Sequence, residues 1–292
     1  MVDITSDESV ARLRDDVRRF LKSQGSVARL VGLVNNAGGL LSSGPVEWTD
    51  VSVDVAQMNL NFVGTVRVTK AFLSLLRESG EGRVVNVSSI LGLVASPLGA
   101  AYAASKFALE GWSDALRREM LPFGVRVSII EPGMFRGTDF YKRYTIPVSE
   151  SWSKLDDSVK DAYGGPYKDY VISRLINIYA ALGSPEPQKV VNVMYDALFN
   201  PAPHRRYRCG FDCVVLARIL EWVPTCIADL SLTVADVAIT WNATMLPRMP
   251  AKGMSKSWTG IIRFALLGYS ISRCMFLSSG IFVLLVYVLF IY

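Results

Sequence analysis

Histidine and cysteine are scarce in this sequence of 292 residues, which holds one histidine and four cysteines. Zinc sites draw mainly on these two residue types, and the spacing of Cys209, Cys213, Cys226 and Cys274 matches no zinc pattern, so we predict no metal site. A disulfide framework is not expected at this length and cysteine density. The one histidine, His204, stands in the basic stretch PHRRYR. A surface residue is the better interpretation there than the base of a Ser-His-Asp hydrolase.

An excess of one charge sign is also missing. The chain has 31 basic and 26 acidic residues, a net charge of +5, and this excess is too small and too scattered to indicate a nucleic-acid partner. The first twenty residues are charged and of helical pattern, so we expect no N-terminal signal peptide. Half of the residues are hydrophobic (51%), which suits one large domain with a sizeable core.

Short apolar runs alternate with longer segments of helical periodicity. The periodicity predicts helices over residues 6–24 and 100–120, and one long helix or two over residues 51–77. Continuous apolar runs predict strands buried on both faces at residues 30–34, 82–89 and 124–133. This alternation indicates an α/β fold with a doubly wound parallel sheet, and ligands bind such sheets outside the carboxyl ends of the strands.

The first residues read as the end of a strand followed by a helix. Val2 and Ile4 flank Asp3 in an alternating pattern, and Thr5 stands three residues before Glu8, the spacing of a capping box. A strand end at residues 2–4 suggests that the first strands of the fold are lacking here. Further along, Ser184 is expected to cap a helix with Pro185 at its first position. We expect residues 140–250 to form helices and loops that cover a pocket.

The C-terminal 18 residues, 275–292, carry no charge and are close to the length needed to cross a bilayer. A buried C-terminal helix is the alternative, but a helix that is apolar on all sides needs cover all round. We therefore predict three parts: a main domain at 1–250, a basic and apolar juxtamembrane segment at 251–273, and a transmembrane helix at 274–292. The basic residues before the helix would keep the main domain on the cytosolic side. Sugar on the sequon at Asn242 would contradict that orientation.

Tyr102 and Lys106 are four residues apart on a predicted helix and so share one face. A phenol titrates near pH 10, and a nearby ammonium favours the phenolate, so the pair can exchange a proton with an alcohol oxygen near neutral pH. Ser89, at the end of a buried strand, could hydrogen-bond the same oxygen, although it could also belong to an ordinary polar turn. Asn59, on the helix between two strands, could hold water near Lys106 or could simply face solvent.

Taken together, the motifs NNAG at 35–38, YAASK at 102–106 and the single residues Asn59, Ser89 and Pro132-Gly133 resemble the short-chain dehydrogenase/reductase family. The resemblance covers residues 1 to about 250. LVNNAG, GRVVNVSSILG and LRREMLPFGVRVSIIEPG are similar to the retinol and 17β-hydroxysteroid dehydrogenase branch, with 3-hydroxybutyrate dehydrogenase more distant.

The resemblance implies a Rossmann-like fold and hydride transfer between an apolar alcohol, retinoid or steroid, and NAD or NADP, with NAD slightly favoured. It implies that Tyr102 is the acid/base. It also implies that Lys106 lowers the pKa of Tyr102 and binds the nicotinamide ribose. Ser89 would orient the substrate oxygen, and Asn59 would hold a water relay. The cofactor would also contact six residues outside the catalytic set, namely Asp3 at the adenine, Asn35, Ala37 and Gly38 along the adenosine, and Pro132 and Gly133 at the nicotinamide. The branch also implies a membrane location, with the endoplasmic reticulum favoured, and a possible homodimer through the helices at 52–78 and 100–120.

Two departures from the family pattern matter for function. The threonine expected four residues after Gly133 is replaced by Gly137, with Thr138 one position later. The glycine-rich motif TGxxxGxG, which lets a pyrophosphate approach a helix N-terminus, occurs nowhere in the chain. An alternative interpretation is therefore a non-catalytic family member that cannot bind the cofactor.

Overall fold

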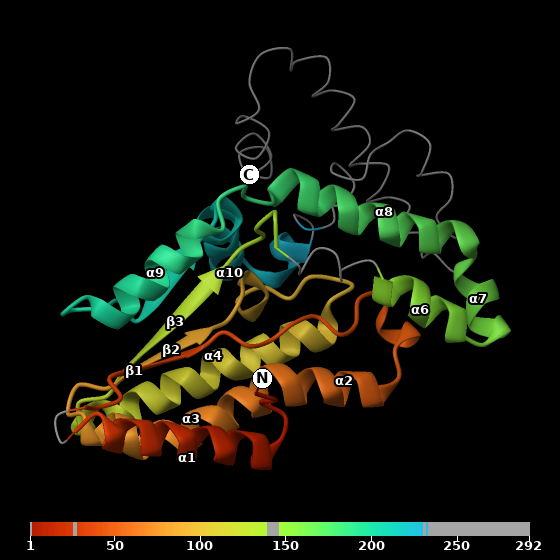
Figure 1. Cartoon of the computed structure of the whole chain (residues 1–292). Helices are drawn as coiled ribbons and strands as arrows, with labels where there is room; N and C mark the ends of the chain where they lie inside the picture. The colour runs from red at the N-terminus through yellow and green to blue at the C-terminus, as the bar shows by residue number, and fades with distance from the viewer. Residues whose placement is uncertain (1, 26–27, 139–145, 230–231, 233–292) are drawn as a thin grey trace. The chain divides into compact units, whose positions relative to one another are not determined.

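The core of the fold is a parallel sheet of four strands in the order β1-β2-β3-β4, of which Figure 1 labels β1, β2 and β3. The structure is a computed structural model that describes residues 2–25, 28–138, 146–229 and 232. Leu33 of β1 pairs with Val84 of β2, and Val84 pairs with Val127 of β3. The strands span these bounds: β1 Gly32–Asn35, β2 Arg83–Val87, β3 Arg126–Pro132 and β4 Arg206–Cys209. The expected α/β fold with a parallel sheet is confirmed.

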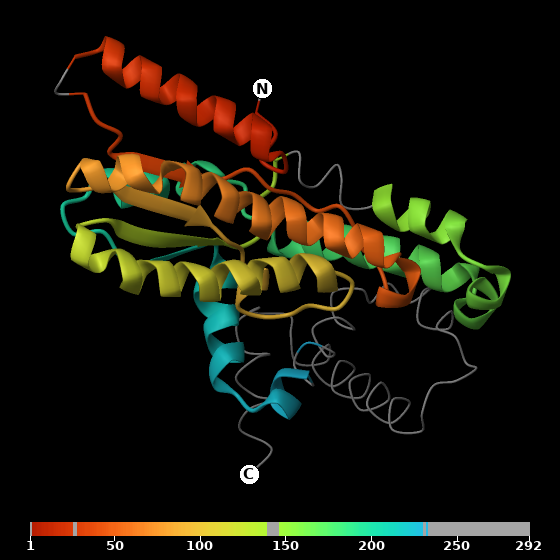
Figure 2. The same cartoon turned by 90° about the horizontal axis from the view of Figure 1, so that it is seen from below.

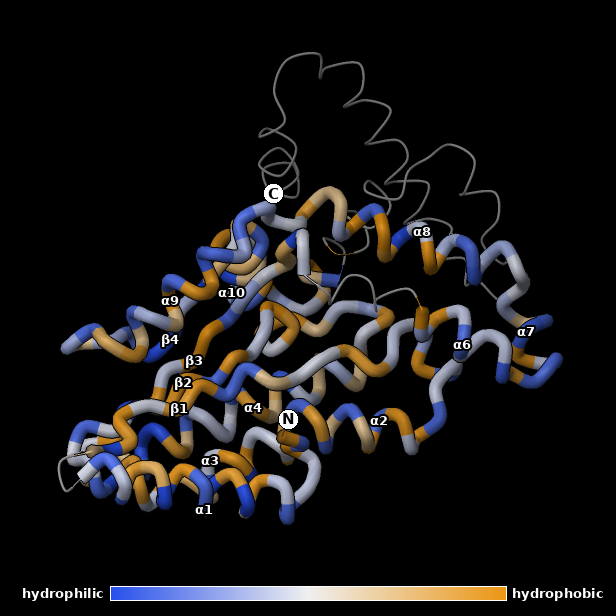
Figure 3. The backbone as a smooth tube through the Cα atoms, viewed as in Figure 1, coloured by the Kyte–Doolittle hydropathy of each residue, from blue (hydrophilic) through white to orange (hydrophobic). Residues whose placement is uncertain are grey.

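Helices α3 (Gly64–Glu78) and α4 (Ala100–Met120) pack on one face of the sheet, and α1 (Asp7–Ser23) packs on α3 (Figures 1 and 2). The core of this layer joins Leu76 of α3 to Val84 and Val127 of the strands. Val10 of α1 meets Phe72 of α3 in a second cluster. Figure 3 shows the alternation of apolar and polar residues along α1 that this one-sided packing requires.

Helix α9 (Gln188–Phe199) covers the opposite face of the sheet. Its Ala197 packs with Val85, Ile130 and Tyr207, which lie on three different strands. Because successive strand residues point to opposite faces, Val84 and Val85 belong to different layers of the core. Both layers are apolar, as expected for strands buried on two faces.

The predicted helix over 51–77 is interrupted by a wider turn. It consists of α2 (Val51–Met58), a π-helical turn η2 (Asn59–Val63) and α3. Gly64 follows this turn, and a Cβ there would press on Ile4 at 2.9 Å, so the glycine permits close packing. π-helical turns inside α-helices occur often at functional sites.

The predictions for the N-terminus were wrong in detail. Val2, Asp3 and Ile4 form no strand, and Ser6 rather than Thr5 caps α1 by accepting a hydrogen bond from the backbone of Ser9. The helix after Ser184 likewise begins later than expected, with Pro187 at its N-cap position. Ser184 instead pairs with Phe135 in a short parallel bridge.

The remaining described elements are connecting turns and helices. Their bounds are η1 Val46–Trp48, η3 Ile90–Gly92, η4 Leu121–Phe123, α6 Ile146–Lys154, α7 Asp157–Tyr163, α8 Gly165–Leu182, η5 Asp212–Ala217 and α10 Arg218–Trp222. The chain divides into two compact units, one of residues 1–156 and 175–223 and the other of residues 157–174 and 224–292. All the strands and the candidate site lie in the first unit.

The predicted membrane helix at 274–292 and the juxtamembrane segment at 251–273 lie outside the described residues. Within the part of the chain that the structure describes, no helix has the length and apolar character needed to cross a bilayer.

Candidate active site

Asn35 ends β1, and its side chain points into the core rather than toward solvent. The side chain is 8% exposed, and its Nδ2 donates to Thr69 Oγ1 and to Asn86 Oδ1, both at 2.8 Å. Asn86 in turn donates to Ser113 of α4 at 2.8 Å. These bonds link β1 and β2 to α3 and α4 just below the carboxyl ends of the strands. Asn35 therefore holds the base of the site together.

Replacement of Asn35 by alanine should lower the stability of the fold. The change leaves the buried oxygens of Thr69 and Asn86 without their donor, which costs about 1–3 kcal/mol of unfolding free energy. Asn36→Ala is the matched control, because the neighbouring Asn36 is exposed and its loss should cost under about 0.5 kcal/mol. Urea denaturation of both variants measures the difference. Equal midpoints would contradict the structural role of Asn35.

Ala37 and Gly38 follow Asn35 as exposed backbone. A Cβ on Gly38 would lie 2.9 Å from Asn61 Oδ1 and 3.8 Å from Lys106 Nζ. The NNAG loop thus passes directly over two polar side chains that come from η2 and α4. A glycine is needed here because any side chain would displace Asn61.

Lys106 is buried in α4 with 6% of its surface exposed. Its Nζ donates to the carbonyl of Val87, the last residue of β2, at 2.9 Å, and lies 5.6 Å from the centre of the Tyr102 ring. Burial lowers the pKa of Lys106 to about 8, while the negative charge of Glu110 acts against this shift. The predicted proximity of Tyr102 and Lys106 is thus present, with both side chains on the buried face of α4.

Ser89 lies two residues beyond the carbonyl that Lys106 binds. It is 9% exposed, and its Oγ accepts a hydrogen bond from the backbone of Leu91 at 3.1 Å as the cap of η3. The hydroxyl hydrogen is still able to donate to a substrate oxygen. Tyr102 is 7% exposed. Ser89 and Lys106 therefore lie at the end of β2, one following the strand and the other on α4, and the Tyr102 ring lies beside Lys106.

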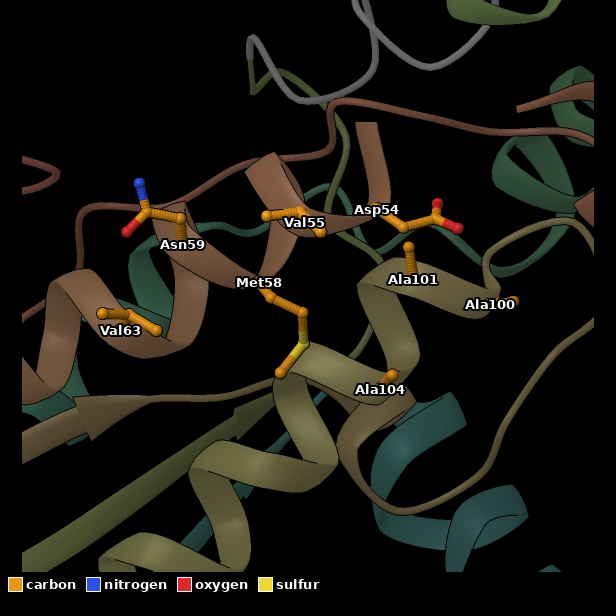
Figure 4. Close-up of a pocket in the computed structure, with 8 residues that line it drawn as sticks. All are labelled: Asp54, Val55, Met58, Asn59, Val63, Ala100, Ala101 and Ala104. Carbon is orange, nitrogen blue, oxygen red and sulfur yellow. The ribbon is translucent and has the colours of Figure 1, made fainter. Parts of the chain in front are cut away.

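Asn59 lies elsewhere. It lines a groove of about 590 Å³ together with Met58 of α2 and with Ala101 and Ala104 of α4 (Figure 4). Ala104 is on the exposed side of α4, whereas Lys106 is on its buried side. The predicted contact between Asn59 and the surroundings of Lys106 is not what the structure shows.

Asn61 takes the place that we predicted for Asn59. It is 1% exposed, and its Nδ2 donates to the carbonyl of Gly39 at 3.1 Å and to Ser105 Oγ at 3.0 Å. Its Oδ1 accepts from the backbone N–H of Gly39 at 2.9 Å. Asn61 thus joins the NNAG loop to α4 beside Lys106.

Helical periodicity contained the signal that separates the two asparagines. Asn61 shares one face with Thr65, Val68 and Phe72 at helical spacing, and all four are buried. Asn59 shares its face with Val63, which is exposed. The position of an asparagine relative to the apolar stripe, rather than its presence on the helix, indicates which one reaches the site.

Pro132 ends β3 and Gly133 follows it, where the backbone N–H of Gly133 donates to the carbonyl of Cys209 at 2.7 Å. A Cβ on Gly133 would collide with the carboxylate of Asp212, which accepts from the backbone of Met134 at 2.7 Å. Asp212 was missed by sequence reasoning and fixes the start of this loop. Gly137 has a positive φ of 80°, and the Thr138 hydroxyl donates to the carbonyl of Phe135 at 3.2 Å.

Asp3 is an exposed residue at the turn before α1. Its Oδ1 accepts from both the backbone N–H and the hydroxyl of Thr5, and these bonds lower the pKa of Asp3. The carboxylate is therefore held in its charged form at the N-terminal turn. Its predicted contact with adenine remains a prediction.

Comparisons with known proteins identify the family of this chain. The family model described as short chain dehydrogenase matches residues 1–146. Retinol dehydrogenase 5 of Mus musculus is 35% identical over 256 residues, which cover 87% of this chain and 75% of that protein. The 17-beta-hydroxysteroid dehydrogenase type 6 of Bos taurus is 36% identical over 80% of this chain and 72% of its own length. D-beta-hydroxybutyrate dehydrogenase of Rattus norvegicus is 38% identical, covering 70% of this chain and 60% of that protein.

A solved short-chain dehydrogenase from Streptomyces avermitilis is similar in fold, with a TM-score of 0.57 and 26% identity over 83% of this chain and 79% of its own. The chain belongs to the short-chain dehydrogenase family, as the sequence motifs predicted. Its relatives include named retinol and 17-beta-hydroxysteroid dehydrogenases.

Proposed function

We propose that this chain is an NAD(P)-dependent oxidoreductase that interconverts an alcohol and a carbonyl on an apolar substrate, a retinoid or a steroid. The observation that carries the proposal is the buried set of Tyr102, Lys106 and Ser89 around the end of β2, with Asn61 beside it. An ammonium next to a phenol favours the phenolate, so Tyr102 can take a proton from an alcohol or return it to a carbonyl oxygen. The names of the retinol and hydroxysteroid relatives support the substrate class.

The residues fit the ribose side of a nicotinamide cofactor. Lys106 uses one N–H on Val87, so its ammonium retains donors for hydroxyl groups, and the exposed backbone of Ala37 and Gly38 lies alongside. NAD(P), when bound, supplies the hydride acceptor. We propose that Lys106 holds the ribose, that Ser89 orients the substrate oxygen and that Asn61, rather than Asn59, holds a water near Lys106. Pro132 and Gly133 would border the nicotinamide.

A non-catalytic role is the second candidate function. The absence of the TGxxxGxG motif favours it, because a bound pyrophosphate would then lack the glycine-rich turn that usually holds it. For the same reason we expect this chain to bind NAD(H) more weakly than micromolar. Calorimetric titration measures this affinity. A micromolar dissociation constant would contradict the expectation and remove the argument for the second candidate.

The activity itself is tested by following the absorbance of NAD(P)H while the chain is incubated with retinol or a 17β-hydroxysteroid. Both NAD⁺ and NADP⁺ are supplied in large excess so that a weak site is filled. We expect cofactor-dependent turnover of at least one of these alcohols. A chain that folds, binds the cofactor and turns over neither alcohol would contradict the substrate class that we propose.

Two partners follow as further proposals. The uncharged run at 275–292 supports a membrane location, with the endoplasmic reticulum favoured, and extraction of the chain from membranes with alkaline carbonate would contradict an inserted helix. The groove beside α2 and α4, with Val55 and Val63 exposed, supports a homodimer. Sedimentation velocity at increasing concentration should show the dimer, and a monomer throughout would rule it out.

A further inference from the structure

Four ionisable residues stand in one row along α4. Tyr102, Lys106, Glu110 and Asp114 follow one another at intervals of four residues, which places them on the same side of the helix. Tyr102, Lys106 and Glu110 are each no more than 7% exposed. A buried glutamate is rare unless it is paired, so Glu110 needs a physical explanation.

Only one oxygen of the Glu110 carboxylate is paired with a cation. Its Oε2 accepts a hydrogen bond from the guanidinium of Arg206 on β4. Its Oε1 is buried and makes no hydrogen bond of regular geometry among the described residues, and the same is true of Ser88 Oγ, but the Ser88 hydroxyl lies near enough to lower the pKa of Glu110. Both atoms lie against Gly92, where a Cβ would be 3.3 Å from Glu110 Oε1 and 2.6 Å from Ser88 Oγ.

Arg206 connects Glu110 to a larger group of charged residues on α4, β3 and β4. Its guanidinium also binds Glu131 of β3 at 2.6 Å and Asp114 at 2.8 Å. Glu131, which is fully buried, is shared with Arg208 at 2.9 Å. The charges that face Glu110 are therefore Arg206 from β4, Glu131 from β3, and Lys106 and Asp114 from its own helix.

Lys106, one helical turn before Glu110, has its charge disfavoured by burial. Among the described residues, the charge that acts to retain the proton on Lys106 is that of Glu110. Burial raises the pKa of Glu110 itself to about 7, and the Ser88 hydroxyl and, to a smaller extent, the Arg206 guanidinium oppose that shift. The Lys106 ammonium and the Glu110 carboxyl therefore change charge within a narrow pH range, and the charge of each affects the pKa of the other.

We propose that Glu110 is a positioning residue whose carboxylate keeps the Lys106 side chain charged and bound to the carbonyl of Val87. Arg206 of β4 holds the Glu110 carboxylate in place, and the charge of that carboxylate in turn acts on Lys106. The consequence for catalysis, a smaller fraction of phenolate at Tyr102 when Glu110 is lost, rests on the proposed function. The effect of Glu110 on Lys106 does not.

The ionisation of Lys106 can be followed directly in the full chain. The protein is prepared in detergent micelles with lysine labelled with carbon-13 at Cε, and the Lys106 signal is assigned by its loss in Lys106→Met. In the unmodified protein we expect the main transition near pH 8 and a smaller one near pH 7, where Glu110 takes up its proton. In Glu110→Gln the main transition should move down by about one pH unit or more, and the smaller one should vanish.

Asp114→Asn is the matched control. Asp114 lies on the same helix and binds the same Arg206, but it is two turns from Lys106. Its replacement should leave the Lys106 transition in place, whereas a general loosening of α4 would move the transition in both variants. An unchanged transition in Glu110→Gln, or an equal shift in Asp114→Asn, would overturn the proposal.

The unmodified protein keeps the proposal testable if Glu110→Gln fails to fold, because a Lys106 signal with no inflection near pH 7 would overturn it without any variant at Glu110. The measurement uses no substrate and no cofactor. A chain without dehydrogenase activity could therefore still show the two transitions, and an active chain could lack them. Failure of this inference and failure of the proposed function are thus distinguishable.

Discussion

Tyr102→Phe should reduce turnover of the alcohol substrate by about 10²- to 10⁴-fold, the usual contribution of a positioned acid/base group. The change removes one hydroxyl and keeps the ring, which packs beside Lys106 in the buried face of α4. We therefore expect the fold to be retained. Turnover is measured at high concentrations of cofactor and substrate, and thermal unfolding is measured on the same preparations.

Tyr195→Phe is the matched control for this change. Tyr195 lies on α9 and is 65% exposed, so loss of its hydroxyl should leave turnover unchanged. If Tyr102→Phe kept near-normal activity, Tyr102 could not be the acid/base. A comparable loss in both variants would point to a general effect of the substitution.

Asn61→Ala should have a large effect on both stability and activity. It removes three hydrogen bonds, two to the backbone of Gly39 and one to Ser105, and leaves buried partners unsatisfied. Each unsatisfied buried group costs about 1–3 kcal/mol of unfolding free energy. The NNAG loop would also lose its link to α4 beside Lys106, so we expect turnover to fall further than stability alone accounts for.

Asn59→Ala provides the comparison, because Asn59 lines the groove beside α2 instead. Its loss should change the unfolding free energy by less than about 0.5 kcal/mol and leave turnover intact. Urea denaturation and steady-state kinetics on the two variants decide between the asparagines. If Asn59→Ala were the more damaging change, the assignment of Asn61 to the site would be wrong.

The elements with strong periodic patterns were predictable from the sequence. The helix expected over residues 100–120 has those bounds in the structure, and the strands around Val85 and Ile129 lie where their apolar runs indicated. The patterns of long amphipathic helices and of strands buried on both faces depend only on which positions are buried. The apolar or polar character of each residue indicates those positions directly. These same elements carry Ser89, Tyr102 and Lys106, so the positions of these three residues could be predicted, whereas their catalytic roles stay a prediction.

Strand β4 could not be recognised because its polar residues are half-buried and held in ion pairs. Arg206 and Arg208 alternate with Tyr207 and Cys209 and were interpreted as part of a basic turn. Their guanidinium groups bind Glu131, which lies on the neighbouring strand β3. Such pairing depends on tertiary contacts, and an arginine alone does not reveal whether it faces water or a buried carboxylate.

The errors at helix starts have a similar cause. Thr5 and Ser6 are both acceptable capping residues, and the choice depends on backbone geometry, since Thr5 is used in a turn with Asp3. Ser184 was expected to cap α9 but is held in a bridge to Phe135. In each case a local preference was overridden by contacts that sequence spacing does not contain.

Transfer of deuterium is the most direct test of the claim that this chain catalyses hydride transfer with Tyr102 as its acid/base. The chain is incubated with retinal or a 17-ketosteroid and with NADH or NADPH deuterated at the transferable C4 position, and the alcohol is analysed by mass spectrometry. We expect one deuterium on the carbinol carbon with the unmodified chain and almost none with Tyr102→Phe. An unmodified chain that binds the cofactor but yields no deuterated alcohol would contradict the account.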